Sequence, residues 1–471
     1  MSEILNKAYN PEWFRKEGHK LVDLLADYLT ECRSNPDQKT INWREPDDLL
    51  ADWKNFFEDE NFEIGDFFKK VIDDGIHIHN PKFIGHQVTP SLPIAGLSDF
   101  LATQINNAMA IYEMGPAPTV MEKIIIDWIS KKAGYRNGDG VLTSGGSLGN
   151  LTALLAARQA KTSYNIWEDG VKENDKPVFM VSEQSHYSNA RAVKIMGLGE
   201  TGILKLPVNS KMQIDATKIE EHFLKAREEG KNIIGFIANA CSTSTGTYDD
   251  LEAIADFCEK YDIWLHVDAA HGGPAIFSDK YKYLVKGIER ADSIAIDFHK
   301  MMMASALTTA VLFKESSHSY ETFAQKASYI LERNNDWFNI ASRTLECTKK
   351  GMSIKLFATI KLYGEKLFDE YVTGRFDTAR EFAQYIDSQS DFENALEPES
   401  NILCFRYVQS DVEDLNKLNA EIRKKVVEDG RFYIVQTIID DKTYLRLSIM
   451  NPFTTLKEFE ELLELIRKTA K

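Results

Sequence analysis

A lysine follows a short apolar run in the segment SIAIDFHKMMMAS, residues 293–305. An ammonium group between this run and three methionines is out of place for a solvated lysine. Burial lowers the pKa of a lysine, and the resulting neutral amine can attack a carbonyl carbon to form an imine. Lys300 is therefore a candidate nucleophile. The alternative is that it extends its ammonium group to solvent, as isolated lysines in such stretches often do.

A carboxylate ends a second apolar run, in LHVDAAHGG at residues 265–273. A carboxylate at the end of a buried strand is unfavourable unless a cation or a hydrogen-bond donor lies beside it. A protonated ring nitrogen would be such a partner for Asp268, and the small residues that follow, including Ala270, would let a flat ring come close. The alternative is that Asp268 caps the next segment.

A turn rich in small residues, TSGGSLGN at 143–150, stands between an apolar run and the apolar helical segment LTALLAAR. Its backbone N–H groups can approach an anion, and the N-terminus of a helix favours negative charge. Gly145 and Gly146 leave the backbone accessible, and Ser144 and Ser147 can add hydroxyl donors. Taken alone, the motif would indicate a structural tight turn.

Two histidines also follow apolar runs. His186 lies in SEQSHYSNARAV, and an imidazole there could stack on an aromatic cofactor and move protons near neutral pH. His299 precedes Lys300 and could contact a phosphate. Each histidine by itself is equally compatible with a structural role at the end of a strand.

The order of these residues indicates a common site. Apolar runs alternate with helical stretches, which predicts a mostly parallel sheet with crossover helices; the runs lie at 141–144, 178–182, 233–238, 263–269, 293–297 and 308–313. Catalytic residues of such sheets gather beyond the carboxyl ends of the strands. An anion site, a carboxylate for a ring nitrogen, a stacking group and a lysine are what pyridoxal phosphate (PLP) requires. The sequence therefore predicts a PLP enzyme.

The flanking segments predict additional structure around this region. Residues 12–32 have the apolar spacing of an amphipathic helix, which we interpret as a docking arm, although any surface helix would show the same pattern. Residues 90–134 are expected to be largely helical. Strands are expected at 401–408, 432–439 and 443–449, before a final helix with a capping box. We predict an N-terminal helical arm (1–85), a large α/β domain (86–350) and a small α+β domain (351–471).

The composition excludes several classes of protein. The chain has 471 residues, 43% hydrophobic and 27% charged, and its net charge of −16 argues against an electrostatic nucleic-acid binder. Its five widely spaced cysteines include no CxxC pair, so neither a disulfide framework nor a zinc site is expected. No apolar run is long enough to span a bilayer, and no signal-peptide core is present. We expect a cytoplasmic protein with no metal site and no membrane partner.

The chain resembles the group II PLP-dependent decarboxylases, which act on aromatic amino acids, histidine, glutamate or cysteine sulfinate. The resemblance extends from FRKEGHKLVDLLADYL (14–29) to LRLSIMNP (445–452). Its most specific elements are HVDAAHGG and ADSIAIDFHK, with thirty-two residues from Asp268 to Lys300. It implies a type I aminotransferase-like fold and an intertwined homodimer with active sites at the subunit interface.

The resemblance also implies a role for each matching residue. Lys300 would hold the cofactor as a Schiff base, Asp268 would pair with the ring nitrogen, and His186 would stack on the ring. Phosphate contacts are implied for Gly146, Ser147 and His299, and a position near the ring for Thr243. Asp297 stands where relatives often have asparagine. Arg446 matches an arginine that contacts the substrate carboxylate in members acting on acidic substrates.

The implied reaction is removal of the α-carboxylate of an L-amino acid as CO2, which leaves an amine. SEQSHYS and LEAIADFC resemble the glutamate and cysteine sulfinate branch, whereas FIGHQVTP is closer to bacterial members that act on diamino acids. We expect an acidic or a diamino acid substrate. We also expect His86, Gln87 and Val88 to read its side chain, because the acidic branch has glutamine at the first of these positions.

Two alternatives remain open from the sequence. Relatives carry a proton-donating tyrosine on a loop that corresponds to residues 331–347, where this chain has Trp337 and Phe338 but no tyrosine; Tyr329 precedes the loop. His186 or a water molecule could donate the proton instead. Alternatively, the enzyme could form an aldehyde by an oxygen-consuming route, since phenylalanine at the loop position accompanies that chemistry in some relatives. A catalytically silent regulatory protein of the same fold is a third interpretation.

Overall fold

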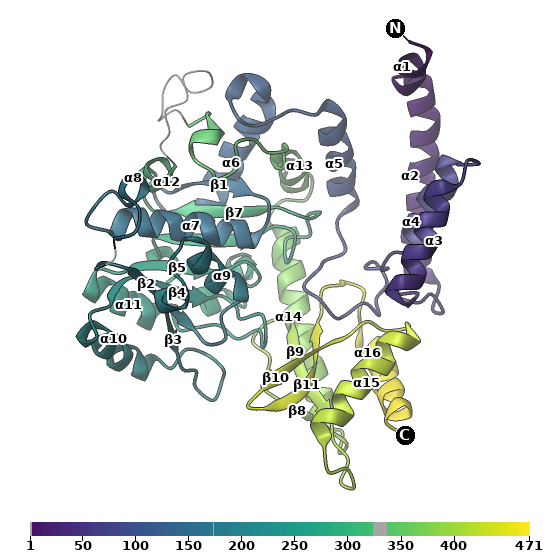
Figure 1. The fold of residues 1–471 in the computed structure, drawn as a ribbon. Helices are drawn as coiled ribbons and strands as arrows, with labels where there is room; N and C mark the ends of the chain where they lie inside the picture. The colour runs from purple at the N-terminus through teal and green to yellow at the C-terminus, as the bar shows by residue number, and fades with distance from the viewer. Residues whose placement is uncertain (1, 173, 324–336) are drawn as a thin grey trace. The chain divides into compact units, whose positions relative to one another are not determined.

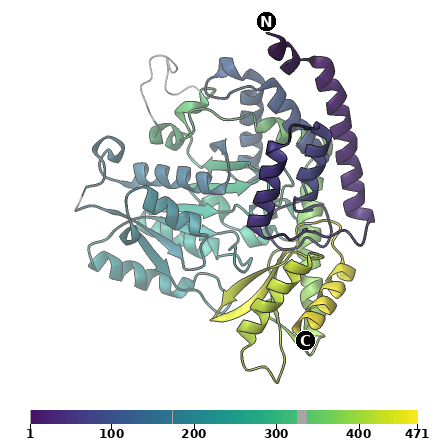
Figure 2. The same ribbon diagram turned by 45° about the vertical axis from the view of Figure 1, so that its right-hand side comes forward.

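The computed structural model describes residues 2–172, 174–323 and 337–471. These residues form two compact units. The larger unit comprises residues 87–380 and 396–403, and the smaller comprises 1–86, 381–395 and 404–471. Each unit is described separately below; Figures 1 and 2 show their elements from two directions.

A seven-stranded sheet forms the centre of the larger unit. Its strands are β1 (Asp139–Thr143), β2 (Pro177–Ser182), β3 (Ile203–Leu206), β4 (Asn232–Asn239), β5 (Trp264–Asp268), β6 (Ser293–Asp297) and β7 (Thr309–Phe313). Their order is β1-β7-β6-β5-β4-β2-β3. Only the pairings that involve β7 are antiparallel among those described. Every residue of β1, β2, β5, β6 and β7 is buried, as expected for a sheet covered on both faces.

Helices cover this sheet. Those of the larger unit are α5 (Pro93–Ile105), α6 (Pro116–Lys132), α7 (Gly146–Lys161), α8 (Ile166–Asp169), α9 (Tyr187–Ile195), α10 (Ile219–Glu228), α11 (Leu251–Tyr261), α12 (Ser317–Thr322), α13 (Ser353–Tyr363) and the first part of α14 (Lys366–Asp387). Helix α7 packs against β4, β5, β6 and β7 and lies across the sheet (Figure 1). Nine of its residues are buried, because alanine and leucine fill the face toward the strands.

Short 3₁₀ helices occupy several connections of the larger unit. They lie at Tyr112–Met114, Glu200–Gly202, Ala216–Lys218, Gly273–Phe277, Lys282–Val285, Ile288–Arg290 and Ile340–Ser342. The segment at Gly273–Phe277 follows β5 closely and contributes buried apolar side chains beside the sheet.

The smaller unit joins both ends of the chain. It contains α1 (Glu3–Ala8), α2 (Pro11–Ser34), α3 (Pro46–Glu58), α4 (Ile64–Asp73), α15 (Leu415–Asp429) and α16 (Leu456–Ala470). Helices α2 and α4 pack together. A four-stranded sheet has the order β10-β11-β9-β8, with β8 (Phe392–Asn394), β9 (Ile402–Tyr407), β10 (Val435–Ile439) and β11 (Lys442–Ser448). The first two residues of β9 are grouped with the larger unit.

Local sequence signals explain the end of this unit. The β10–β11 hairpin turns at Asp440 and Asp441, whose φ angles of 46° and 60° are those of a two-residue turn matched to the strand twist. Thr455 and Glu458 form the predicted capping box at the start of α16. The predicted α/β class, with a mostly parallel sheet and a small C-terminal antiparallel sheet, is confirmed.

The division into units differs from the predicted domain limits. Residues 351–380 group with the larger unit, because α13 packs on α5 and α6. Residues 1–86 group with the C-terminal segments through backbone bonds such as Ile84 N–H to Tyr433 O, 3.2 Å, and Ser448 N–H to Ile84 O, 2.7 Å. These contacts join residues far apart in sequence, so hydrophobic periodicity carries no signal for them.

Strands β3 and β8 have no counterpart among the predicted strands; both are short. No helix within the described ranges is both long enough and apolar enough to cross a lipid bilayer.

Candidate active site

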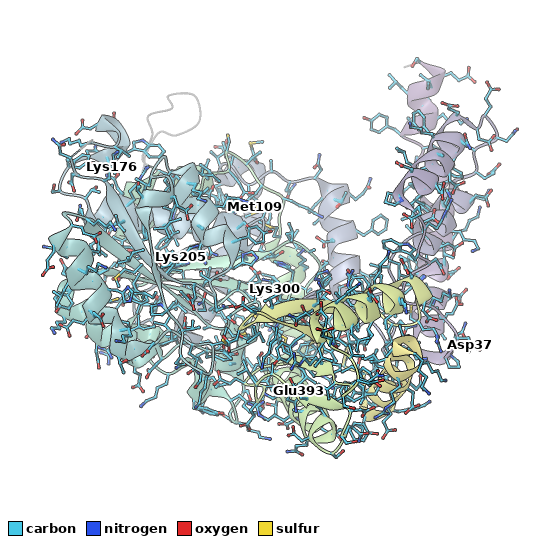
Figure 3. The ribbon with its side chains drawn as sticks, turned by 60° about the horizontal axis from the view of Figure 1, so that its bottom comes forward. Asp37, Met109, Lys176, Lys205, Lys300 and Glu393 are labelled. Atoms are coloured by element: carbon cyan, nitrogen blue, oxygen red, sulfur yellow. The ribbon has the colours of Figure 1, made fainter. Side chains whose placement is uncertain are left out.

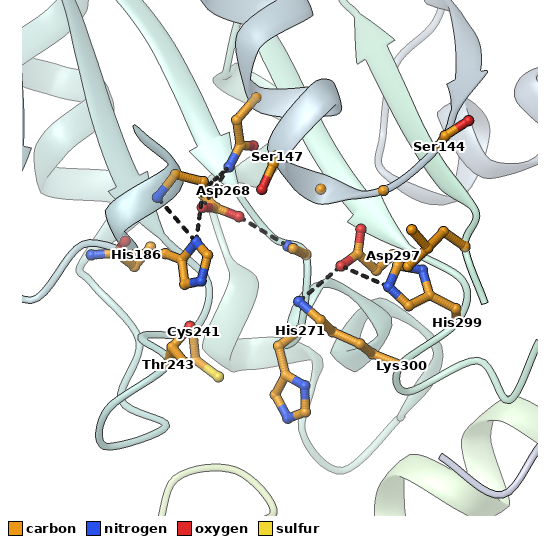
Figure 4. Close-up of a pocket in the computed structure, with 17 residues that line it drawn as sticks. Ser144, Ser147, His186, Cys241, Thr243, Asp268, His271, Asp297, His299 and Lys300 are labelled. Carbon is orange, nitrogen blue, oxygen red and sulfur yellow. Dashed lines mark hydrogen bonds and ion pairs between the residues drawn. The ribbon is translucent and has the colours of Figure 1, made fainter. Parts of the chain in front are cut away.

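A cavity of about 280 Å³ opens at the carboxyl ends of the central strands of the larger unit. Its lining includes every residue predicted to bind the cofactor: Ser144, Gly145, Gly146, Ser147, His186, Thr243, Asp268, Ala270, Asp297, His299 and Lys300. Asn150, Ser188, Asn239, Cys241, His271 and Leu307 complete the described lining. Figure 3 labels Lys300 among the side chains that it draws, and Figure 4 shows the cavity at close range.

Lys300 lies just beyond β6, and its amine faces Asp297 at the end of that strand. The Nζ atom is 2.8 Å from Asp297 Oδ2, and His299 Nε2 is 3.6 Å from the same oxygen (Figure 4). The hydroxyl of Thr309 donates to Asp297 Oδ1. The buried Asp297 carboxylate therefore lies close to both the Lys300 amine and the His299 imidazole.

The structure corrects the expectation that burial makes Lys300 less basic. Burial does act to lower its pKa, but the charge of Asp297 and the hydrogen bond to it raise the pKa above the ordinary lysine value. In turn, burial would raise the pKa of Asp297, yet Lys300 and His299 hold it below its usual range. The pair is thus an ammonium and a carboxylate, and an incoming carbonyl must compete with Asp297 for the amine.

Asp268 ends β5 and is held by two side-chain amides. Asn150 of α7 donates to its Oδ2 atom at 2.8 Å, and Asn189 of α9 donates to the same atom at 2.9 Å. Its Oδ1 atom accepts a longer bond, 3.3 Å, from the Ala270 backbone amide. A carboxylate oxygen can accept two bonds, so Oδ1 can still receive a donor from the cavity.

His186 caps the start of α9. Its Nδ1 atom lies 2.7 Å from Ser188 Oγ and accepts the Ser188 backbone N–H at 3.3 Å. Burial lowers the pKa of this half-buried imidazole, and Lys300 acts in the same direction while Asp268 opposes it. A neutral imidazole is therefore presented to the cavity from the side opposite Lys300 (Figure 4).

The turn that opens α7 fits an anion. Gly145 has a φ angle of 109°, a backbone conformation that residues other than glycine rarely adopt. Within the described structure, no side chain caps the start of this helix. A Cβ atom at Gly146 would lie 3.2 Å from both carboxylate oxygens of Asp297, so the turn approaches the amine–carboxylate pair as closely as backbone allows. The first N–H groups of a helix have no partner within it and are suited to phosphate.

One contact at this turn was not foreseen. The Ser144 hydroxyl donates to Glu346 Oε1 at 2.6 Å. Glu346 belongs to a segment anchored along β1, where Arg343 pairs with Asp139 at 2.6 Å. A second carboxylate therefore lies beside the predicted phosphate turn. Sequence periodicity cannot predict this contact, because Ser144 and Glu346 are 202 residues apart.

The four predicted substrate contacts are not among the described residues that line this cavity. His86 and Arg446 belong to the smaller unit, and Gln87 and Val88 begin the larger one. In the smaller unit, burial lowers the pKa of His86, and the charges of Arg446 and Arg423 add to this effect. Tyr329 lies outside the described residues, and residues 337–347 contain Trp337 and Phe338 but no tyrosine.

Sequence reasoning missed Asn150 and Asn189 as partners of Asp268. A weak signal existed for the first, which ends the TSGGSLGN motif one turn into α7. A third missed residue is His266, whose Nε2 atom lies 3.1 Å from Asn150 Oδ1. It stands two residues before Asp268 on a strand and so shares its face of the sheet.

The residues present fit PLP on the observations above. An uncapped helix start beside a glycine turn suits a phosphate, the remaining capacity of Asp268 Oδ1 suits a protonated ring nitrogen, and an amine lies in the same cavity. PLP supplies an electron sink for the bond that breaks at the substrate α-carbon.

Comparison with known proteins agrees with this interpretation. Residues 53–408 match the model of the pyridoxal-dependent decarboxylase conserved domain. The chain is 28% identical to an aromatic-L-amino-acid decarboxylase of Bacillus atrophaeus over 100% of this chain and 98% of the relative. It is 30% identical to an L-2,4-diaminobutyrate decarboxylase of Acinetobacter baumannii over 83% of this chain and 80% of the relative.

A solved structure extends the match to the fold. The glutamate decarboxylase domain of diaminobutyrate-pyruvate transaminase and L-2,4-diaminobutyrate decarboxylase from Vibrio parahaemolyticus superimposes with a TM-score of 0.84, at 26% identity and 95% coverage of both chains. The family match covers most of the chain, and the cavity fits the cofactor that defines it. The chain therefore belongs to the pyridoxal-dependent decarboxylase family and is a PLP-dependent amino acid decarboxylase.

Proposed function

We propose that this enzyme removes the α-carboxylate of an acidic or a diamino L-amino acid, with Lys300 holding PLP as a Schiff base. The observation that carries the proposal is that the Lys300 amine, the Asp268 carboxylate and the open start of α7 line one cavity. Each group suits one part of PLP: the aldehyde, the ring nitrogen and the phosphate.

The remaining cavity residues complete this assignment. The Ser144–Ser147 turn and His299 bind the phosphate, and Thr243 and Ala270 lie beside the ring. His186 stacks on the ring face. Because burial lowers its pKa, its imidazole is neutral near neutral pH, so it must first take up a proton before it can donate one. Asp297 holds the Lys300 amine near the turn until a carbonyl takes its place.

Trapping tests the role of Lys300. Holoenzyme treated with borohydride should carry a reduced PLP adduct on the peptide that contains Lys300. Lys300→Ala should bind PLP without a trapped adduct, whereas Lys314→Ala, a control at an exposed lysine, should be trapped like the unmodified enzyme. An adduct that maps to another lysine would overturn the assignment.

The substrate proposal rests on His86, Gln87, Val88 and Arg446. The positive charges of Arg446 and Arg423 near His86 support this proposal. Together with burial, they lower the pKa of His86, so its imidazole is neutral. Such a cluster suits a side-chain carboxylate and disfavours a second ammonium group, so within the proposed pair we favour the acidic class.

A panel of amino acids tests this choice. Holoenzyme is incubated with glutamate, aspartate, cysteine sulfinate, 2,4-diaminobutyrate, lysine and aromatic amino acids, and CO2 and amine are measured together. His86→Gln and Arg446→Lys should change the ratio of kcat/KM between acidic and basic substrates. Unchanged ratios across the panel would remove these residues from substrate recognition.

A second candidate function is aldehyde formation, in which O2 is consumed and CO2, ammonia and peroxide are released. It is favoured by one observation: residues 337–347 contain Trp337 and Phe338 but no tyrosine. We favour the simple decarboxylation, with His186 or a water molecule as the proton donor. Equal yields of amine and CO2 without peroxide would support it, and peroxide equal to CO2 would support the alternative.

We also propose that the enzyme is a homodimer with active sites at the subunit interface. Helix α5 supports this with an exposed apolar row, because Leu97, Leu101 and Ile105 are 55%, 55% and 46% exposed at four-residue spacing. We propose that a second copy of the chain packs against this apolar row of α5. Leu101→Glu should give a monomer in sedimentation, whereas Leu362→Glu, at an equally exposed leucine of α13, should not.

A cytoplasmic location completes the proposal. All five cysteines lie within the described ranges, and none of them forms a disulfide. This pattern is usual for proteins of a reducing compartment.

A further inference from the structure

A row of buried polar side chains runs from Asn150, which lines the cavity beside Asp268, to residues that are not part of the described lining. Asn150, which donates to Asp268, is 3.1 Å from His266 Nε2, and His266 Nδ1 is 2.9 Å from Ser293 Oγ. The Trp264 indole Nε1 lies 2.9 Å from the same Ser293 oxygen. Trp264, His266 and Ser293 are at most 1% exposed. We call Trp264, Ser293, His266 and Asn150 the donor chain.

The chemistry of its ends fixes the direction of the donor chain. A carboxylate only accepts, so Asn150 presents its NH2 group to Asp268 and its carbonyl oxygen to His266. His266 must then carry its proton on Nε2. Because burial keeps this imidazole neutral, Nδ1 accepts, and the Ser293 hydroxyl donates to it. The Trp264 indole N–H can only donate, so its hydrogen bond is accepted by the Ser293 hydroxyl oxygen.

The fold explains why these groups meet. Trp264, His266 and Asp268 are alternate residues of β5 and therefore lie on one face of the sheet. Ser293 begins β6 and is the register partner of His266. Helix α7 packs over β5 and β6 and brings Asn150 onto the same face. The helix that opens at the phosphate turn thus also reaches the partner of the ring nitrogen.

We propose that the donor chain is a positioning device for the cofactor ring: it fixes the Asp268 carboxylate so that its free capacity on Oδ1 meets the ring nitrogen of PLP. This inference rests on the proposed role of Asp268. Hydrogen bonds that all run in one direction strengthen one another in a buried site, and the last donor acts on a charged acceptor. Asn150 and His266 are therefore positioning residues, which act through Asp268 and favour a cofactor with a ring nitrogen.

A pair of cofactors isolates this effect. PLP is compared with its deaza analogue, in which a C–H group replaces the ring nitrogen while the aldehyde and phosphate remain. Dissociation constants for the apo-protein are measured by quenching of protein fluorescence. The ratio of the two constants reports the ring nitrogen alone, because contributions from the phosphate turn and from Lys300 cancel.

The variants are chosen to separate donation from packing. His266→Phe removes the donor and keeps a ring, His266→Gln returns an N–H near the Nε2 position, and Ser293→Ala removes the next hydroxyl. Thr152→Val is the control, because Thr152 is a buried residue of α7 whose hydroxyl bonds only locally, to Leu148 O at 2.8 Å. Thermal melting of each apo-protein checks that it is folded.

His266→Phe should reduce the preference for PLP over the deaza analogue about ten-fold, the effect expected for loss of a bond in a chain that ends on a charged group. His266→Gln should restore most of the preference, Ser293→Ala should reduce it less, and Thr152→Val should leave it unchanged. If His266→Phe does not fold, Ser293→Ala decides, and an unchanged preference in that variant overturns the proposal.

Two further outcomes are distinguishable. Equal weakening of both cofactors by His266→Phe would mean that the donor chain only supports packing, and would overturn the inference. Asp268→Ala provides the reference. If it leaves the preference unchanged, the proposed role of Asp268 fails; if it abolishes the preference while His266→Phe does not, only the donor chain fails.

Discussion

The Lys300 amine and the Asp297 carboxylate form an ion pair of 2.8 Å at the end of β6. Burial alone would make the lysine less basic, but Asp297 raises its pKa above the ordinary value. The candidate nucleophile is thus stored in its protonated form before cofactor capture. The Asp297 carboxylate thus positions the Lys300 amine and, by keeping it protonated, leaves it without the free lone pair that attack on a carbonyl requires.

Asp297→Asn should therefore shift the pH profile of cofactor capture. Without the carboxylate, burial dominates and the pKa of Lys300 falls, so the neutral amine exists at lower pH. The rate at which apo-protein captures PLP, followed by absorbance, should reach its plateau at a lower pH than in the unmodified protein. Asp279→Asn, at an exposed aspartate paired with Lys282, serves as the control. A profile that stays in place would show that Asp297 does not set the basicity of Lys300.

Glu346→Gln should tighten cofactor binding. Glu346 accepts the Ser144 hydroxyl beside the phosphate turn, so its charge opposes a phosphate there. Glutamine keeps an acceptor for Ser144 and removes the charge, which should lower the Kd for PLP by about three-fold, as expected for one partly screened charge. The measurement is fluorescence titration with PLP at two salt concentrations, with exposed Glu315→Gln for comparison. Weaker binding would mean that the carboxylate supports the turn instead.

Lys349→Met should destabilise the larger unit. Lys349 Nζ lies 2.6 Å from Glu122 Oε1, and the two side chains are only 1% and 2% exposed. Removing one member leaves a buried charge, at a cost of about 3–5 kcal/mol in the free energy of unfolding. The double variant Lys349→Met/Glu122→Leu should recover part of this loss, because no uncompensated charge remains. Urea denaturation followed by circular dichroism would reveal the difference, and equal stability of the single and double variants would contradict it.

Stability should fall in mild acid through His266. Burial lowers the pKa of this histidine from 6.5 to about 4, with Asp268 opposing the effect. Below pH 6.5 the unfolded chain binds a proton that the folded protein excludes, so stability is full above this pH and decreases as the pH falls toward 4. Between pH 7 and pH 5 the loss should be about 2 kcal/mol.

The His266→Gln variant isolates this contribution, because glutamine does not titrate. The difference in unfolding free energy between pH 7 and pH 5 should be smaller in His266→Gln than in the unmodified apo-protein by the same amount. Carboxylates remote from His266 titrate alike in both proteins and cancel in the comparison, whereas Asp268, whose charge acts on His266, is part of the effect that is measured. An identical pH dependence would mean that His266 is protonated in the folded protein.

The sequence by itself determined the chemistry of the site. Lys300, Asp268 and the turn at 143–150 each follow an apolar run, and the ends of parallel strands meet at one edge of a sheet. That rule needs only local patterns and chain order, so the fold class and the candidacy of Lys300, Asp268 and the turn could be predicted from them. Thr243 and Asp297, in contrast, became candidates only through the family resemblance. The alternation of apolar runs and helical stretches missed only short strands such as β3, because four residues are too few to form a recognisable apolar run.

Tertiary structure alone decided how these groups are tuned. The bonds from Asn150 and Asn189 to Asp268 join residues far apart in the chain, and the contact between Ser144 and Glu346 does the same. The expected decrease in the pKa of Lys300 became an increase because packing placed Asp297 against its amine. Residue types and spacing identify which groups can react, but pKa values and hydrogen-bond direction depend on distance and burial, which only the folded chain defines.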